Sequence, residues 1–174
     1  MSRPRLILLV GPVLSGKSLF VERIVGALRC EGFAISGFLQ RGVFGADGRK
    51  VGHDLVGISS GSCLPLARRS EPGEGWRFED DAFEAAVGEV RVGADLVVID
   101  EVGHLELAGK GHAAAVERAL SSSAAVLIVV REALAEDATR WLSPRADVNR
   151  VRFEPGEEEK ILSEIRALLT PGKT

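Results

Sequence analysis

The chain has 174 residues and a formal net charge of −3; 45% of its residues are hydrophobic and 27% are charged. This balance is ordinary for a globular protein, and the length predicts a single domain, 1–174, that buries about two thirds or more of its unfolded surface. Aromatic residues make up only 5%, and the arginines are scattered among acids. The composition argues against base-stacking modules and polyanion-binding stripes, so we expect no nucleic-acid partner.

Cysteine usage and the longest apolar runs bear on where the protein works. Cys30 and Cys63 lie far apart and show no C-x-x-C spacing, so we expect two reduced thiols packed in the core. The apolar run 6–10 follows basic residues, as in a signal peptide, but it breaks at Gly11-Pro12. No later stretch approaches the roughly 20 apolar residues that span a membrane. We therefore expect a cytoplasmic protein with no membrane partner; a protein partner is possible but nothing in the sequence indicates one.

The first informative stretch is residues 11–18, which read Gly-Pro-Val-Leu-Ser-Gly-Lys-Ser and match the phosphate-binding pattern G-x-x-x-x-G-K-[ST]. The apolar run 6–10 suits a strand buried on both faces, and helical spacing follows over 17–29. This order places the N-terminus of a helix, with its unpaired N–H groups, beside bound phosphates. We therefore predict a Walker A loop for a nucleoside triphosphate, with these binding residues: Gly11, Pro12, Val13, Leu14, Ser15, Gly16, Lys17, Ser18 and Leu19.

The next part of the chain predicts strands in a hairpin. Residues 33–40 favour a strand, and the turn Ala-Asp-Gly-Arg at 46–49 is followed by a returning strand over 51–58. The whole segment 37–69 is rich in glycine and has no helical period, so we expect an antiparallel extension of the sheet. Three of its arginines, Arg41, Arg68 and Arg69, are either mobile groups that approach phosphate or plain surface charges. A loop is expected at 71–75 and a short extended piece at 76–78.

A second strand that ends in carboxylates follows a helix. The helix is expected to run to about residue 90, capped by Asp80 or Asp81. The apolar strand 95–101 then ends in Asp100 and Glu101, the arrangement expected of a Walker B strand beside the phosphate loop. The remaining chain predicts a loop, helices and strands in alternation: 102–110 (loop), 112–121 (helix), 125–130 (strand), 132–141 (helix), 148–153 (strand) and 157–169 (helix), before a short tail at 170–174. Such alternation predicts an α/β three-layer sandwich with a mainly parallel sheet.

These two stretches supply the parts of a phosphoryl-transfer site. Lys17 would lie between the β- and γ-phosphates as a catalytic cation, and the Ser18 hydroxyl would coordinate Mg²⁺, the expected cofactor. Asp100 would hold the same ion through a water molecule. Glu101 is the candidate catalytic base that deprotonates an attacking water. The alternative is that Glu101 caps a neighbouring helix or pairs with a surface arginine.

Four further residues have open roles. Arg131 ends a predicted strand and either senses the γ-phosphate or is a solvated surface residue. Glu106 either orients Glu101 or binds an arginine. Asn149 and Arg150 either contact the nucleobase or form structural pairs.

With these stretches in order, the chain resembles the THEP1 family of nucleoside-triphosphatases, a P-loop family of the RecA-like group with a catalytic glutamate. The resemblance spans nearly the whole chain, and its most specific segment is Asp-Glu-x-Gly-x-x-Glu-Leu at 100–107. The individually weaker segments are 11–18, 37–39, 48–49, 52–54, 64–68 and 149–150. The resemblance implies slow, Mg²⁺-dependent hydrolysis of ATP, GTP and other nucleoside triphosphates with little base discrimination.

The chain departs from the family pattern in its phosphate loop, where Val13-Leu14 replaces the usual Pro-Gly and Leu19 replaces a Thr. Side chains at Val13 and Leu14 are expected to disfavour the backbone conformation that the loop requires. His104 replaces a Lys and His53 a Phe. These differences bear on turnover more than on fold.

Two other functions fit the same motifs. A nucleotide or small-molecule kinase uses the same loop, and the segment 37–69 would then be an acceptor-binding lid. A nucleotide-dependent switch or assembly factor would use hydrolysis to reset a partner interaction. The sequence leaves the physiological nucleotide and the oligomeric state open.

Overall fold

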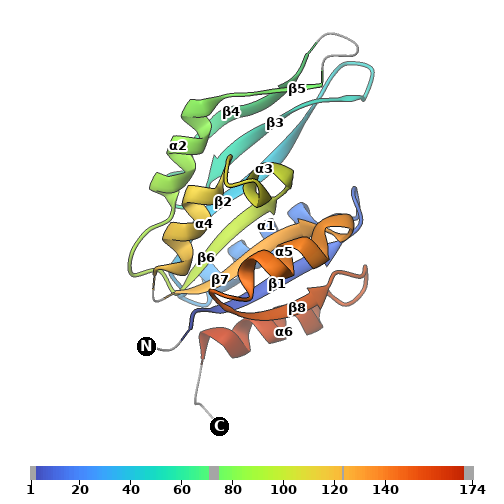
Figure 1. Cartoon of the computed structure of the whole chain (residues 1–174). Coiled ribbons are helices and arrows are strands. Elements are labelled where there is room, and N and C mark those ends of the chain that lie inside the picture. The colour runs from blue at the N-terminus through green and yellow to red at the C-terminus, as the bar shows by residue number, and fades with distance from the viewer. Residues whose placement is uncertain (1–2, 71–74, 123, 171–174) are drawn as a thin grey trace.

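The computed structural model describes residues 3–70, 75–122 and 124–170. Their strands form one eight-stranded sheet in the order β5-β4-β3-β2-β6-β7-β1-β8 (Figure 1). In chain order the strands are β1 (Arg5–Gly11), β2 (Ile35–Phe44), β3 (Lys50–Gly57), β4 (Cys63–Arg69), β5 (Trp76–Phe78), β6 (Leu96–Val102), β7 (Ala125–Arg131) and β8 (Asp147–Arg152). The helices are α1 (Lys17–Cys30), α2 (Asp80–Glu89), α3 (His104–Leu107), α4 (Ala113–Leu120), α5 (Ala135–Leu142) and α6 (Glu158–Leu169), with a 3-10 turn at Glu132–Leu134.

The sheet has a parallel half and an antiparallel half. β2, β6, β7, β1 and β8 pair in parallel, and β2, β3, β4 and β5 pair antiparallel. The outer ends of β2 and β3 extend beyond the helical layers, while α2 packs against β2, β3 and β4 (Figure 1). The predicted mainly parallel α/β fold and its hairpin extension are therefore confirmed.

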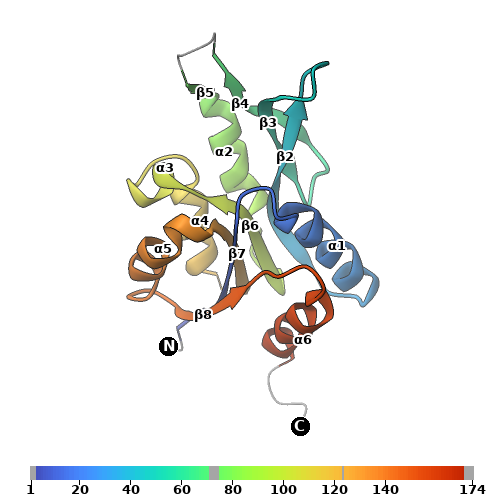
Figure 2. The same ribbon diagram turned by 90° about the vertical axis from the view of Figure 1, so that its right-hand side faces the viewer.

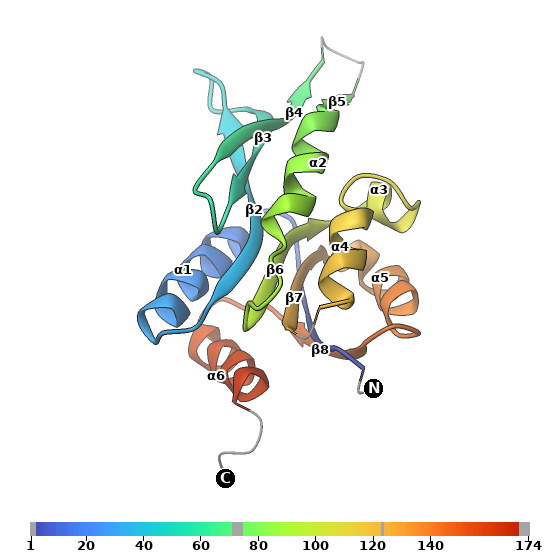
Figure 3. The same ribbon diagram turned by 90° about the vertical axis from the view of Figure 1, so that its left-hand side faces the viewer.

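Helices cover both faces of the parallel strands, which makes three layers (Figures 2 and 3). Alternate residues of β1 point to opposite faces: Ile7 and Leu9 pack in the cluster that includes α1 and α6, whereas Leu6 and Leu8 pack in the cluster that includes α2, α4 and α5. This period of two, buried on both sides, explains why β1 is an unbroken apolar run.

The strand order separates the two motif-bearing strands. β6, which carries the two carboxylates near its end, does not lie directly beside β1, because β7 pairs with both of them. Parallel strands have their carboxyl ends at one edge of the sheet, so the end of β6 still faces the loop that follows β1. Adjacency in the sheet was not needed to bring the two motifs together.

Several element boundaries differ from the predicted ones. β2 continues to Phe44, because its pairing with β3 extends to that residue. The expected loop 102–110 contains the end of β6 and the short helix α3, whose four residues give no periodic pattern. The helix expected over 132–141 begins with a 3-10 turn and continues as α5 to Leu142.

The predicted cap of α2 is also wrong. Glu79 precedes the helix, and no side chain caps its first turn. Asp80 and Asp81 lie within that turn, where the positive end of the helix dipole favours their charge.

The two thiols are not in the core. Cys30 and Cys63 are both exposed. Cys30 ends α1 beyond Leu28, the last inward residue of that helix, and Cys63 begins the exposed end of β4. The predicted loop 71–75, apart from Gly75, and the tail beyond Thr170 lie outside the described residues. Within the described ranges no helix is long and apolar enough to cross a membrane.

Candidate active site

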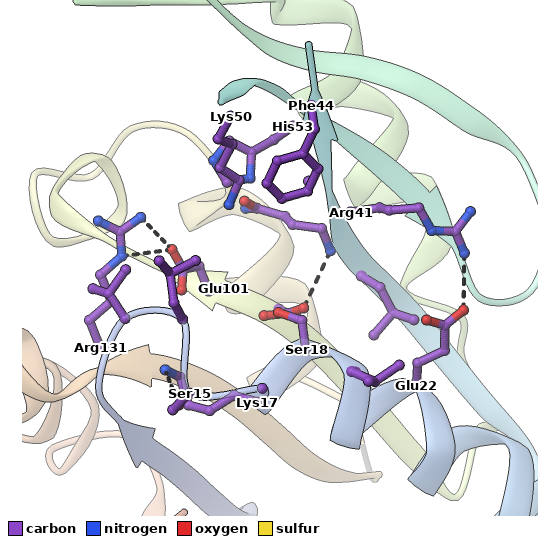
Figure 4. Close-up of a pocket in the computed structure, with 18 residues that line it drawn as sticks. Ser15, Lys17, Ser18, Glu22, Arg41, Phe44, Lys50, His53, Glu101 and Arg131 are labelled. Carbon is purple, nitrogen blue, oxygen red and sulfur yellow. Dashed lines mark hydrogen bonds and ion pairs between the residues drawn. The ribbon is translucent and has the colours of Figure 1, made fainter. Parts of the chain in front are cut away.

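A cavity of about 530 Å³ opens at the carboxyl edge of the parallel strands, between the loop after β1 and the β2–β3 hairpin (Figure 4). Of the predicted binding residues, Val13 to Leu19 line it, together with Asp100, Glu101 and Arg131. Gly11 and Pro12 do not line the cavity. The other lining residues, which were not predicted except for Arg41, are Glu22, Leu39, Gln40, Arg41, Gly42, Phe44, Lys50 and His53.

The phosphate loop is a sharp turn that leads into α1. Gly16 precedes the helix with φ 90° and Leu14 has φ 58°, so both residues adopt the left-handed conformation. That region suits glycine but is strained for leucine. The expected conflict between Leu14 and the loop backbone is therefore present in the structure, and the loop tolerates it.

Lys17 is buried at the base of this turn, with 6% of its surface exposed. Its ammonium donates hydrogen bonds to the carbonyls of Gly11, at 2.8 Å, and Pro12, and to the Ser15 hydroxyl at 3.3 Å. Burial lowers the pKa of Lys17, and the charges of Glu101 and Asp100 oppose that shift. Gly11 and Pro12 thus contribute to the site by orienting Lys17.

Asp100 lines the cavity and is fully buried. Its Oδ2 accepts a hydrogen bond from the Gln40 backbone N–H at 3.4 Å, whereas its Oδ1 has no partner among the described residues. Burial, and then the charge of Glu101, raise the pKa of Asp100 to about 7, against the lowering effect of a hydrogen bond from Ser18. A buried, unpartnered carboxylate oxygen beside a hydroxyl is a donor set that fits Mg²⁺.

Glu101 is held by Arg131 from the neighbouring strand β7. Its Oε1 accepts from Arg131 Nε at 2.9 Å and from Nη2 at 2.8 Å (Figure 4). Its Oε2 accepts no hydrogen bond from any residue that the structure describes. The carboxylate is therefore fixed in orientation, with one oxygen available to a ligand in the cavity.

The hairpin brings Lys50 and His53 into the cavity, and sequence reasoning missed both. They lie on β3, where Lys50 faces Phe44 and His53 faces Gly42 on β2. Burial, and then the charge of Lys50, lower the pKa of His53 to about 4, so His53 is neutral at pH 7. The predicted turn at 46–49 implies that Lys50 pairs with the end of β2. What the sequence does not reveal is that the hairpin leans over the phosphate loop.

Glu106 has a structural role instead of either predicted one. It is buried and accepts hydrogen bonds from the backbone N–H groups of Gly103, at 2.7 Å, and His112, at 2.8 Å. It therefore fixes the segment between β6 and α4 and neither orients Glu101 nor binds an arginine.

The predicted nucleobase contacts are also structural. Asn149 donates to Glu164, and Arg150 pairs with Glu136, both outside the cavity. The alternative of structural pairing is therefore the one that holds.

Of Arg41, Arg68 and Arg69, only Arg41 reaches the cavity, where it pairs with Glu22 of α1 at 3.0 Å (Figure 4). Arg68 pairs with Asp54 at 2.6 Å, outside the cavity. Arg69 also lies outside it, with its guanidinium 5.8 Å from the centre of the Trp76 ring.

Comparison with known proteins shows the family of this chain. The sequence model of the NTPase family matches residues 6–166. The chain is 29% identical to a nucleoside-triphosphatase THEP1 of Thermococcus kodakarensis, over 85% of this chain and 86% of the relative. It is 32% identical to a cancer-related nucleoside-triphosphatase homolog of Bos taurus, over 71% of this chain and 73% of the relative.

Solved structures show the same fold. The solution structure of a human cancer-related nucleoside triphosphatase superposes with a TM-score of 0.73 at 24% identity, covering 98% of this chain and 100% of that one. The crystal structure of THEP1 from Aquifex aeolicus gives a TM-score of 0.70 at 18% identity, covering 94% and 98%. With a family match over most of its length, the chain belongs to the THEP1 family of nucleoside-triphosphatases.

Proposed function

We propose that this protein hydrolyses nucleoside 5′-triphosphates, ATP and GTP among them, to the diphosphate and phosphate in a Mg²⁺-dependent reaction. One observation carries the proposal: Glu101, locked by Arg131 with Oε2 available, shares one cavity with a phosphate loop and Lys17. A site that only bound nucleotide would not need an oriented carboxylate at the cavity wall.

The loop and Lys17 position the phosphates. The backbone N–H groups from Val13 to Ser18 belong to the phosphate loop and the first residues of α1, where the helix dipole favours an anion. Lys17 lies in the same turn and would exchange its hydrogen bonds with loop carbonyls for phosphate oxygens. Its ammonium adds the charge that the β- and γ-phosphates need.

Ser18 and Asp100 would hold the Mg²⁺ ion, because the unpartnered Oδ1 of Asp100 and the Ser18 hydroxyl are oxygen ligands of the kind this ion prefers. When bound, the ion supplies positive charge that offsets the charge of the phosphate chain.

Glu101 activates the water. Its Oε2 takes a proton from a water molecule as the water oxygen forms a bond to the γ-phosphorus. The bond from that phosphorus to the β–γ bridging oxygen breaks, and its electron pair leaves with the diphosphate. Arg131 keeps Oε1 engaged, so the carboxylate presents Oε2 to the water.

We also propose slow turnover and broad acceptance of bases. Each contact described above is made to the phosphate chain or to its metal ion, and none reads a base edge. The strained Leu14 in the loop is one reason to expect a slow rate.

The test follows the label of γ-labelled ATP in the presence of candidate nucleosides, nucleotides and small alcohols. The proposal predicts that label appears as free phosphate, at similar rates from ATP and GTP, and that chelation of Mg²⁺ stops it. Label that appears on an acceptor faster than as free phosphate would overturn hydrolysis in favour of a kinase. A rate that rises by orders of magnitude with a protein partner would instead identify a switch.

A further inference from the structure

Lys50, the first residue of β3, is a cation in the cavity that has no partner in the part of the chain that the structure describes. Four basic side chains line the cavity, and three of them are engaged: Lys17 by loop carbonyls, Arg41 by Glu22 and Arg131 by Glu101. Among the described residues, no hydrogen bond or ion pair involves the Lys50 ammonium. Figure 4 shows Lys50 across the cavity from Ser15 and Lys17.

The strand beside Lys50 is shaped to let its side chain cross. A Cβ atom placed on Gly42 would lie 3.0 Å from Lys50 Cε and 3.0 Å from Phe44 Cε2. Both contacts are closer than side chains normally accept, so the missing side chain of Gly42 makes the groove in which the Lys50 stem lies. The register of β2 on β3 shifts between Val43 and Phe44, directly beside this groove.

The charges that act on Lys50 belong to the hydrolytic site. Burial lowers the pKa of Lys50, the charge of Glu101 raises it, and Arg131 and Asp100 have smaller effects. Glu101 and Asp100 are the acids whose fields reach Lys50, but Glu101 is already paired with Arg131, and Asp100 is buried below. Lys50 lines the same cavity as the phosphate loop and Glu101, where the terminal phosphate of the proposed substrate would lie.

We propose that Lys50 is a catalytic residue that binds oxygens of the terminal phosphate and stabilises the charge that develops as the bond to the diphosphate breaks. This role rests on the proposed hydrolysis and adds to it a source of charge opposite the phosphate loop. The extension of the sheet would then complete the active site within one chain. Loss of one such preorganised donor lowers the rate of other enzymes by about 10²- to 10³-fold.

The test compares Lys50→Met with Arg49→Gln. Methionine keeps an unbranched apolar stem and removes the charge. Arg49 is the neighbouring residue, with 83% of its side chain exposed and its charge paired with Asp47, so its variant controls for the loss of one positive charge from the hairpin. Equal urea midpoints will show that both variants are folded.

Two readouts, the rate of phosphate release and the affinity for triphosphate, are expected to change in Lys50→Met and not in Arg49→Gln. Single-turnover release of phosphate should fall by about 10²-fold or more. Affinity for a non-hydrolysable triphosphate should fall, while affinity for the diphosphate should stay within about twofold. Lys50→Arg should restore part of the rate because it keeps the charge.

Gly42→Ala gives an independent check, because a methyl group there should displace the Lys50 stem without removing its charge. Gly42→Ala should slow phosphate release, and the double variant with Lys50→Met should be no slower than Lys50→Met alone. Additive losses would show that Gly42 does not act through Lys50 and would overturn the proposed groove.

The outcomes separate this proposal from the proposed hydrolysis. If the unchanged protein hydrolyses triphosphates and Lys50→Met does so at the same rate, the role of Lys50 is refuted and hydrolysis stands. If the unchanged protein releases no phosphate, hydrolysis is refuted, and the rate-enhancing role of Lys50 is refuted with it. In that case a preference for triphosphate over diphosphate that Lys50→Met abolishes would still support the contact with the terminal phosphate.

Discussion

Leu14→Gly should stabilise the protein, although it removes a side chain. Leu14 has φ 58° and is 85% exposed, so it gains little packing to offset its conformation. A left-handed conformation costs a residue with a Cβ atom about 1–2 kcal/mol, and glycine in its place costs about 0.5–1 kcal/mol of unfolded-state entropy. The midpoints of these two ranges predict a net gain of about 0.75 kcal/mol in the free energy of unfolding.

Val13→Gly is the matched control. Val13 is the preceding residue, is 61% exposed and does not have a positive φ. It should therefore show the entropy cost alone and lose about 0.5–1 kcal/mol. Urea denaturation of the two variants should move the midpoints in opposite directions at an unchanged m-value. Equal destabilisation by both would refute the assignment of strain to Leu14.

Two other predictions concern Glu106 and His112, in the segment between β6 and α4. Glu106→Ala leaves the backbone N–H groups of Gly103 and His112 without their acceptor, so urea denaturation should show a free energy of unfolding lower by about 2–4 kcal/mol. Glu106→Gln keeps one acceptor oxygen and should lose less. A loss of under about 0.5 kcal/mol in Glu106→Ala would contradict the structural role of Glu106. Burial lowers the pKa of the His112 imidazole to about 3, below its unfolded value of 6.5. Between these two values the unfolded state binds a proton that the folded state does not, so the free energy of unfolding falls as the pH drops through 6.5. The loss between pH 7 and pH 5 should be about 2 kcal/mol larger in the unchanged protein than in His112→Gln, and equal losses would contradict it.

The fold was largely predictable because its signals are local. The apolar run of β1 reflects burial on both faces of the sheet, and the turn at 46–49 contains a glycine, Gly48, that tolerates a positive φ. Both signals can be recognised from a few neighbouring residues. The short helix α3 was missed because it has no repeat, and the glutamate that stabilises it bonds to backbone groups on either side.

The phosphate-loop side of the cavity was predictable for a different reason. Its contacts are made within one short segment, from Gly11 to Ser18, so sequence spacing fixes their geometry. Asp100 and Glu101 were found because they end an apolar strand. Arg131 was named, but its ion pair with Glu101 depends on β7 lying beside β6, which the sequence does not specify.

The hairpin side of the cavity was not predictable in the same way. Lys50 and His53 reach it only because β3 pairs with β2 in a particular register and because the hairpin lies over the phosphate loop. The prediction of buried thiols was wrong for a related reason. Cysteine is buried on average, but this preference does not account for Cys30 at the end of α1 or Cys63 at the exposed start of β4.

The measurement that tests the account most directly is single-turnover hydrolysis by Glu101→Gln with nucleotide already bound. Glutamine keeps the size of the side chain and removes its basicity. If Glu101 is the base, affinity for triphosphate should stay within about threefold while the rate of phosphate release falls by about 10²-fold or more. Hydrolysis by Glu101→Gln at the rate of the unchanged protein would contradict the central claim, because the water would then be activated by another group.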